Sequence, residues 1–191
     1  FRQSFVGPIL FPGDPTYDAV RTVWNKMYDR KPAMIARCTG VADVIDAVNF
    51  ARNHRLLFTV RGGGHHVAGF AMQDDALVID LSLLKGIQVD PKNRIARAQP
   101  GVTLAELDRE TQAFGLATPL GVVSETGIAG LTLGGGMGWL RRKYGLACDN
   151  LIGADMVTAD GEFRHLTAEE HSDLFWGIRG GGGNFGIVTS F

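Results

Sequence analysis

Three dense clusters of glycine constrain this chain more than any other feature of its sequence. They lie at residues 62–64, 134–138 and 180–183, in a chain of 191 residues with 26 glycines, where average usage of about 7% predicts roughly 13. The clusters show no collagen-like or linker-like repeat. Glycine adopts backbone conformations that other residues resist, and it lets another group approach the main chain closely. The clusters therefore indicate local functions of the backbone.

The first part of the chain reads as a small unit of strands and helices. Apolar residues at helical spacing predict a helix over residues 41–54, with Thr39 as a candidate cap, and another over roughly 16–28. Three side chains share one face of the expected helix over 16–28: Val20, Trp24 and Met27. Buried strands are expected at residues 33–38, 56–61 and 77–82. This order, strand, helix, strand, loop and strand, ends near Leu84.

The second part begins with an expected hairpin over residues 86–99, whose turn is 90-DPKN. Thr103 and Glu106 form a capping-box pattern that predicts a helix through Phe114. The stretch 121–138 holds too many glycines for a stable helix, since each costs about 1 kcal/mol relative to alanine. Later elements are expected as two strands within 151–166 joined at Asp160-Gly161, a short helix over 167–176 and a strand over 186–191. The fold class is α+β, with two α/β subdomains of about residues 1–85 and 86–191.

Composition excludes several classes of protein. The formal net charge is -1, so no basic excess points to nucleic acid. No apolar run is long enough to cross a bilayer and no signal peptide is visible, so we expect no membrane partner and a cytoplasmic location. Cys38 and Cys148 are too few for a disulfide framework and are expected to be small buried hydrophobes. The chain starts at Phe1 and stops at Phe191 inside an expected strand, so we expect a piece of a longer protein.

The segment 61-RGGGHH emerges from an apolar strand and is the first candidate site. Successive backbone N–H groups in a glycine turn form a concavity that binds anions such as pyrophosphate. Arg61 either adds positive charge there or pins the loop by pairing with a carboxylate. A flexible surface loop remains the alternative from the residues alone. The segment is not a P-loop, because no Gly-Lys-Ser/Thr follows, and not a Rossmann fingerprint, because no helix follows at once.

A metal site is not expected. His65 and His66 are adjacent and cannot easily point at one ion, and no third ligand has a recognisable spacing. His54, His165 and His171 have polar neighbours in the sequence and are interpreted as surface residues. The glycines of 127-GIAGLTLGGGMGWL allow two readings, close packing of backbone against backbone or a surface for a flat ligand. The third cluster, 180-GGGGNFGIV, again joins a glycine loop to a strand.

Four stretches occur together and in order: 12-PGDPTYDAVRTVWN, 61-RGGGHHVAGF, 134-GGGMGWLRRKYGLACDN and 175-FWGIRGGGGNFGIV. In these the whole chain resembles the FAD-binding domain of the vanillyl-alcohol oxidase type (PCMH-type), as found in berberine bridge enzyme-like FAD-linked oxidases. The resemblance implies two α/β subdomains that hold extended FAD between them. It also implies a substrate domain and a C-terminal segment that are absent from this chain.

The resemblance assigns the candidate residues their roles. It implies that backbone amides of residues 61–65 bind the pyrophosphate and that His65 is joined covalently to the 8α-methyl group of the flavin, while His66 lines the site. It places residues 119–121 near the isoalloxazine ring and residues 186–188 near the adenine. The implied cofactor-binding residues are Arg61, Gly62, Gly63, Gly64, His65, His66, Gly69, Pro119, Gly121, Thr126, Gly127, Gly130, Gly138, Gly186, Ile187 and Val188.

One departure from the family is informative. Many relatives form a second flavin bond through a cysteine that aligns with Val123 here, and valine cannot form a thioether, so attachment through His65 alone is expected. Thr126, at a position that influences oxygen access, favours an oxidase over a dehydrogenase. The implied reaction is hydride transfer from an alcohol or C–H group of a small organic substrate to flavin N5, with oxygen as acceptor. The family's catalytic base belongs to parts outside this chain, so no catalytic residue is assigned. The alternatives are a dehydrogenase of the same fold with noncovalent FAD, a redox-inactive FAD-binding module and a nucleotide-binding protein of another class.

Overall fold

The computed structural model describes residues 2 and 4–191. Its first sheet has the strand order β1-β2-β4-β3, in which β2, β4 and β3 run parallel and β1 is antiparallel to β2. The 14-residue helix α2 (Val41–His54) connects β2 to β3, as the helical spacing predicted. These strands are β1 (Ile9–Leu10), β2 (Met34–Arg37), β3 (Phe58–Arg61) and β4 (Leu77–Asp80). The predicted strand-helix-strand-loop-strand order is confirmed.

The second half of the chain contributes a hairpin and a three-stranded sheet. The predicted hairpin is present as β5 (Ile87–Asp90) and β6 (Ile95–Ala98), which pair antiparallel. The three-stranded sheet has the order β8-β7-β9, and Phe191 exchanges two backbone hydrogen bonds with Ala98 to join it to the hairpin. The sheet strands are β7 (Ala154–Val157), β8 (Phe163–Leu166) and β9 (Ile187–Ser190). The remaining elements are α3 (Leu104–Gln112), α4 (Ile128–Leu133), α5 (Arg141–Tyr144), the 3-10 turn Cys148–Asn150 and α6 (Ser172–Ile178).

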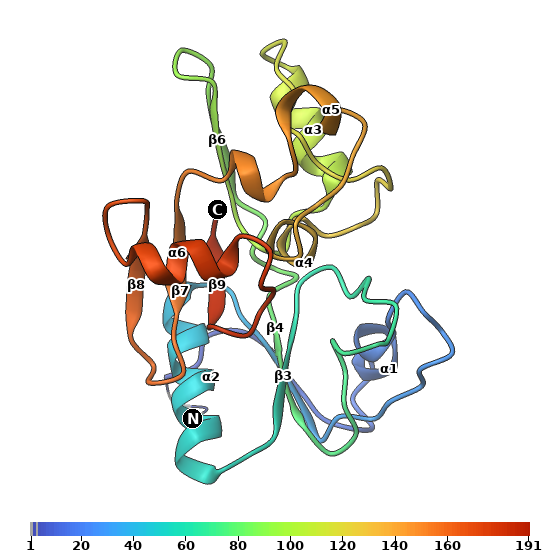
Figure 1. Cartoon of the computed structure of the whole chain (residues 1–191). Helices are drawn as coiled ribbons and strands as arrows, with labels where there is room; N and C mark the ends of the chain where they lie inside the picture. Colours follow the sequence, from blue (N-terminus) through green and yellow to red (C-terminus); the bar gives the residue numbers. More distant parts are fainter. Residues whose placement is uncertain (1, 3) are drawn as a thin grey trace.

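Helix α2 packs between the two sheets (Figure 1) and links their cores. Its buried face, which includes Val44 and Val48, belongs to a hydrophobic cluster that also contains Ile79 of β4. Val157 of β7 and Ile187 of β9 complete the same cluster from the second sheet. The two sheets therefore share buried apolar contacts across α2. No helix in the described part of the chain is long and apolar enough to span a membrane.

Local capping chemistry was predicted correctly for one helix and wrongly for another. Thr103 caps α3 in a capping box with Glu106, as predicted, and the helix ends at Gln112, two residues before Phe114. Thr39 was expected to cap α2, but the N-cap is Gly40. The Thr39 hydroxyl donates instead to the Asp43 carboxylate at 2.7 Å. Burial opposes the charged form of Asp43, but hydrogen bonds from Thr39 and the Val6 amide outweigh it and lower the pKa of this carboxyl.

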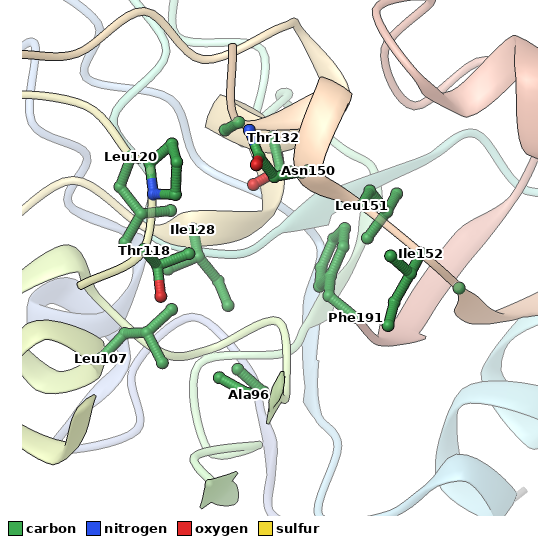
Figure 2. Close-up of a pocket in the computed structure, with 14 residues that line it drawn as sticks. Ala96, Leu107, Thr118, Leu120, Ile128, Thr132, Asn150, Leu151, Ile152 and Phe191 are labelled. Atoms are coloured by element: carbon green, nitrogen blue, oxygen red, sulfur yellow. The ribbon is translucent and has the colours of Figure 1, made fainter. Parts of the chain in front are cut away.

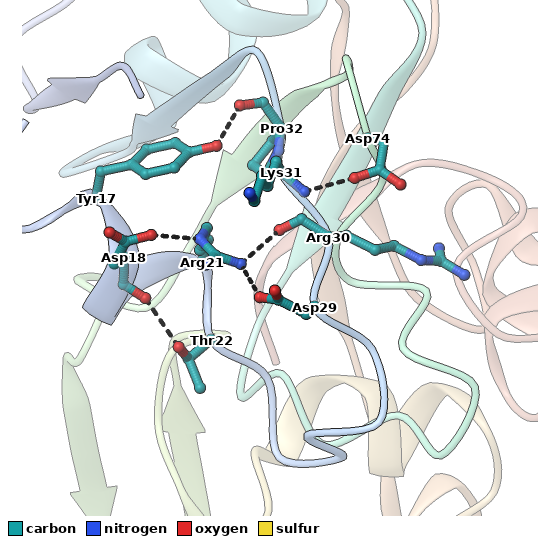
Figure 3. Close-up of polar contacts among 9 residues, drawn as sticks. All are labelled: Tyr17, Asp18, Arg21, Thr22, Asp29, Arg30, Lys31, Pro32 and Asp74. Atoms are coloured by element: carbon teal, nitrogen blue, oxygen red, sulfur yellow. Dashed lines mark hydrogen bonds and ion pairs between the residues drawn. The ribbon is translucent and has the colours of Figure 1, made fainter. Parts of the chain in front are cut away.

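The predicted helix over 16–28 is wrong in its length. Helix α1 covers only Tyr17–Arg21, and Thr22 is already extended. Figure 3 shows the reason: the Arg21 guanidinium donates to the carboxylates of Asp18 and Asp29 and to the carbonyl of Arg30, which lie on both sides of the following loop. Trp24 is then exposed and does not pack on a helix face. Tertiary contacts thus override the helical spacing in this segment.

Two other expectations need correction. Residues 128–133 do form the helix α4 despite Gly130, because Ile128, Ala129, Thr132 and Leu133 are buried on it. The helix expected over 167–176 is shifted and covers Ser172–Ile178. The cysteines are as expected: Cys38 and Cys148 are free and buried. Desolvation, with the nearby Asp43 and Asp80 carboxylates, raises the pKa of the Cys38 thiol far above its usual range.

Candidate cofactor-binding site

Residues 61–67, which begin at the last residue of β3, are termed the histidine loop. The backbone amides of Gly62, Gly63, Gly64, His65 and His66 donate no hydrogen bond to any other described residue. Gly64 has a φ of +65°, a conformation in which glycine is strongly favoured. Backbone amides shielded from water normally have hydrogen-bond partners. The amides of residues 62–66 have none among the described residues, so these donors are available to an external acceptor. This is the arrangement that binds an anion.

The first and second glycine segments meet at one backbone contact. A Cβ atom on Gly63 would lie 2.5 Å from the Gly127 nitrogen, and one on Gly127 would lie 2.6 Å from the Gly63 nitrogen. Figure 1 shows α4, which Gly127 precedes, directly beyond the end of β3. Both residues must therefore be glycine for the two segments to lie this close. Of the two readings of the middle segment, backbone packing is correct at this point.

The turn before α3 completes this junction. The Ile128 amide donates to the Val102 carbonyl at 2.9 Å, and the Leu104 amide donates to the Thr126 carbonyl at 2.9 Å. Thr126 is held in turn by its amide, which donates to Val123 at 3.0 Å. Residues 126–128 are thus fixed against the start of α3, and the histidine loop rests on them.

Arg61 pins the histidine loop. It does so through backbone carbonyls and not through a carboxylate, which one of the two expectations had named. Its Nη1 donates to the Val20 carbonyl, and its Nη2 lies 3.5 Å from the Thr22 carbonyl. Burial lowers the pKa of the Arg61 guanidinium; Asp80 opposes this effect and Arg37 adds to it. The Arg61 Nε is buried without a hydrogen-bond partner among the described residues. Arg61 therefore ties the loop to the end of α1 and to Thr22, the residue that follows this helix, and keeps its charge close to the loop.

The two adjacent histidines have different environments. The His65 ring stacks on the Trp24 indole, with 4.5 Å between ring centroids and 21° between planes. Its Nε2 is buried and has no hydrogen-bond partner among the described residues. His66 is exposed, stacks on Phe70, and its Nδ1 accepts from the Ala68 amide at 3.0 Å. A buried polar atom without a partner requires an explanation. His65 has such an atom, Nε2, and His66 has none. The other three histidines, His54, His165 and His171, are exposed, as expected.

The predicted residues of the middle segment fall into two groups. Gly121 packs against Leu131, and Gly138 lies against the Leu120 carbonyl so closely that any Cβ would overlap it. These glycines permit packing within the chain. Gly130 differs, because a Cβ there would meet nothing within 4 Å. No contact within the chain requires glycine at residue 130, which leaves room beside α4 for another group.

An apolar pocket lies on the inner side of this segment. Figure 2 shows Leu107, Ile128 and Phe191 around it, and Pro119 is also part of its wall. Its volume is about 80 Å³, far below the roughly 300–1,000 Å³ of typical sites for small organic ligands. The pocket is too small for a dinucleotide and is not the candidate site.

The third glycine segment meets the second at the end of α4. The amides of Gly180 and Gly182 both donate to the Leu133 carbonyl at the end of α4. Gly69 lies behind the histidine loop against the Tyr28 ring, and Gly186 lies against Met156. The side chains of Ile187 and Val188 are both buried in hydrophobic clusters.

Comparison with known proteins decides the family. A family model described as an FAD binding domain matches residues 32–167. The chain belongs to this FAD-binding domain family. The (R)-6-hydroxynicotine oxidase of Paenarthrobacter nicotinovorans is 40% identical over 186 residues, which are 97% of this chain and 41% of that protein.

Solved structures extend the agreement to the fold of this FAD-binding domain. The crystal structure of 6-hydroxy-D-nicotine oxidase from Arthrobacter nicotinovorans superposes with a TM-score of 0.95 at 40% identity, over 98% of this chain and 41% of that one. The berberine bridge enzyme-like protein 1 of Physcomitrella patens gives a TM-score of 0.95 at 32% identity, over 99% of this chain and 42% of that one. The vanillyl-alcohol oxidase-type fold expected from the motifs is therefore confirmed. The chain spans about two fifths of the length of these relatives.

The geometry of the FAD-binding domain fits its cofactor. The unused amides of residues 62–66 suit the pyrophosphate, and the bare side of α4 at Gly130 suits a flat or extended group. Sequence reasoning missed Trp24 as a part of this site. The available signal was its place in 12-PGDPTYDAVRTVWN, one of the stretches that carry the resemblance, but the helical spacing assigned it to a helix face.

A pair of alanine substitutions separates packing glycines from glycines that face open space. Gly127→Ala is expected to destabilise the FAD-binding domain by about 1–3 kcal/mol, because its Cβ would force the histidine loop away from α4. Gly130→Ala is expected to raise stability by up to about 1 kcal/mol, since it lies inside a helix with no neighbour. Urea unfolding of the two apo variants measures both. Equal stability of the two variants would contradict the tight contact at Gly127.

Proposed function

We propose that this chain is the FAD-binding part of an FAD-linked oxidoreductase that oxidises an alcohol or C–H group of a small organic substrate. The observation that carries the proposal is the run of five unused amides in the histidine loop, held against Gly127. When bound, FAD supplies the redox chemistry by accepting a hydride at N5. The names of the relatives, a hydroxynicotine oxidase and a xylooligosaccharide oxidase, support this class of reaction. The substrate-binding part and the catalytic base belong to the rest of the polypeptide.

The proposal places FAD between two subdomains, residues 1–85 and residues 86–191. Support comes from the sheets, since the strands of the first end at Asp80 and those of the others begin at Ile87. The histidine loop and Gly127 come from opposite sides of that boundary and touch. The amides of residues 62–66 hold the pyrophosphate, and residues 119–121, 126–127 and 130 follow the flavin and its ribityl chain. Residues 186–188 lie near the adenine. The side chains of Ile187 and Val188 are buried in the core, so these residues would contact the adenine through backbone atoms.

His65 is the proposed point of covalent attachment. With FAD bound, His65 would hold it by a C–N bond from an imidazole nitrogen to the 8α carbon of the flavin. One methyl C–H bond and the imidazole N–H bond would be lost as protons, and the two electrons released would pass to molecular oxygen, giving hydrogen peroxide. The buried, unpartnered Nε2 of His65 supports this residue over the exposed His66. Val123 offers no thiol, which supports a single attachment point.

The acceptor and the redox activity are tested together. Flavin in the full-length protein is photoreduced without oxygen and then mixed with aerated buffer or with a quinone dye, while its absorbance is followed. We expect oxygen to reoxidise the flavin faster than the dye does, as in an oxidase. Faster reaction with the dye would identify a dehydrogenase, and a flavin that neither acceptor reoxidises would contradict the proposed oxidoreductase. A protein that retains no FAD at all would contradict the binding function itself.

A further inference from the structure

We infer that Trp24 is a positioning residue for His65: its indole fixes the plane in which the imidazole bonds to the flavin. This inference rests on the proposed attachment and adds a residue 41 positions away in the sequence. The two rings are stacked at 4.5 Å with 21° between their planes. Trp24 is nonetheless 57% exposed, so it does little to stabilise the core. Its position is explained by the ring that it covers.

The main chain around Trp24 is fixed to the histidine loop. The Trp24 amide donates to the Gly64 carbonyl at 3.0 Å, and the Asn25 side-chain amide donates to the Val67 carbonyl at 2.7 Å. Arg61 donates from the loop to the Val20 and Thr22 carbonyls. Residues 20–25, the clamp segment, thus bind the histidine loop before, beside and after His65. The stack therefore lies at the centre of the contact between the clamp segment and the histidine loop.

The loop that carries the clamp segment is closed at its base. Tyr17 donates its hydroxyl to the Pro32 carbonyl at 2.6 Å, and Arg21 bridges from α1 to Asp29 and to the Arg30 carbonyl, as Figure 3 shows. The Thr22 hydroxyl donates to the Asp18 carbonyl at 2.8 Å. These bonds close the loop that carries Trp24 and fix its base independently of the indole. Replacing the Trp24 side chain should therefore leave the clamp segment in place.

The physical effect of the stack is orientation. The second side-chain torsion of histidine is broad and roughly two-fold, so an uncovered imidazole samples several planes. An indole stacked on one face of the ring restricts it to one plane without using its Nε2, which has no hydrogen-bond partner among the described residues. Holding a reacting group in a productive geometry lowers the entropic part of a barrier. Trp24 is thus expected to change the rate of attachment rather than the affinity for FAD.

The test compares Trp24→Leu with Trp24→Phe in the full-length protein prepared without flavin and then given saturating FAD. Covalent flavin is followed in time by mass spectrometry of the denatured protein. We expect Trp24→Leu to slow attachment about threefold to tenfold, the range that a stacked aromatic pair provides, and Trp24→Phe to remain within about twofold of wild type. The dissociation constant for FAD before attachment and the melting temperature should change little in either variant. The control is Trp176→Leu, because Trp176 is a 79% exposed tryptophan on α6 with no ring contact among the described residues.

The outcomes separate this inference from the proposed function. If wild type gains no covalent flavin, the attachment at His65 is wrong and the role of Trp24 fails with it. If wild type gains covalent flavin and Trp24→Leu gains it equally fast, the attachment stands and the positioning role is overturned. If Trp24→Phe is as slow as Trp24→Leu, stacking is not the cause, which also overturns the inference. Equal slowing in Trp176→Leu would show a nonspecific effect and overturn it as well.

Discussion

His65→Ala is expected to remove all covalently bound flavin from the full-length protein. Alanine has no nitrogen that can bond to the 8α carbon, and Val123, where the family resemblance implies a cysteine in many relatives, offers no thiol for a second attachment point. The amides of residues 62–66 remain, so FAD should still bind noncovalently. After acid denaturation, wild-type protein should stay yellow, while the variant should release its flavin into the supernatant.

His66→Ala is the matched control for this prediction. Both histidines lie on one tryptic peptide, residues 62–85, so fragmentation of this peptide locates the added FAD mass. His66 is exposed and stacks on Phe70, and we expect its removal to leave the covalent flavin intact. Release of all FAD from denatured wild-type protein, or an FAD mass on residue 66, would contradict attachment through His65.

The elements that the sequence predicted well are those whose signals are local. The capping box at Thr103 and Glu106, the hairpin around 90–93 and the helix over 41–54 each depend on residues within a few positions of one another. The errors arise where distant contacts decide. Helix α1 ends at Arg21 because its guanidinium bonds to Asp29 and Arg30, and α4 forms despite Gly130 because its apolar residues are buried.

The candidate site divides in the same way. The anion-binding character of residues 61–66 could be predicted because glycine geometry is a local property, and the unused amides agree with it. The contact of Gly63 with Gly127 and the stack of Trp24 on His65 join residues far apart in the sequence. No periodicity or spacing marks such pairs. The family motifs pointed to these segments as a site, but only the fold shows how they meet.

Asp80→Ala is expected to cost about 3–5 kcal/mol of unfolding free energy, the usual range when one partner of a buried ion pair is removed. The Asp80 side chain is 0% exposed and accepts from Arg37 Nε at 3.0 Å. Ser82 adds two more bonds, from its amide at 3.0 Å and from its hydroxyl at 2.9 Å. Because whole domains are stable by only about 5–15 kcal/mol, this loss is expected to be measurable as a large shift in urea unfolding.

The position of Asp80 connects this stability to the cofactor site. In the parallel sheet, Asp80 of β4 lies in register with Arg37 on one side and with Arg61 on the other. Without the carboxylate, two guanidinium groups would face each other across β4 with no anion between them. Arg61 begins the histidine loop, so the Asp80→Ala variant should also bind FAD more weakly. Titration of the folded fraction with FAD measures this loss separately from the loss of stability.

Two further variants distinguish the buried charge from an ordinary ion pair. Lys85→Ala removes one side of an exposed pair with Glu106, in which both side chains are more than 40% exposed, and should cost at most about 1 kcal/mol. Asp80→Asn retains an oxygen that can accept from the Ser82 amide but loses the charge that Arg37 needs, so it should fall between the two. If Asp80→Ala costs no more than Lys85→Ala, the arginines at the ends of β2 and β3 do not depend on this carboxylate, and the clamp segment and the contact with Gly127 must anchor the histidine loop without it.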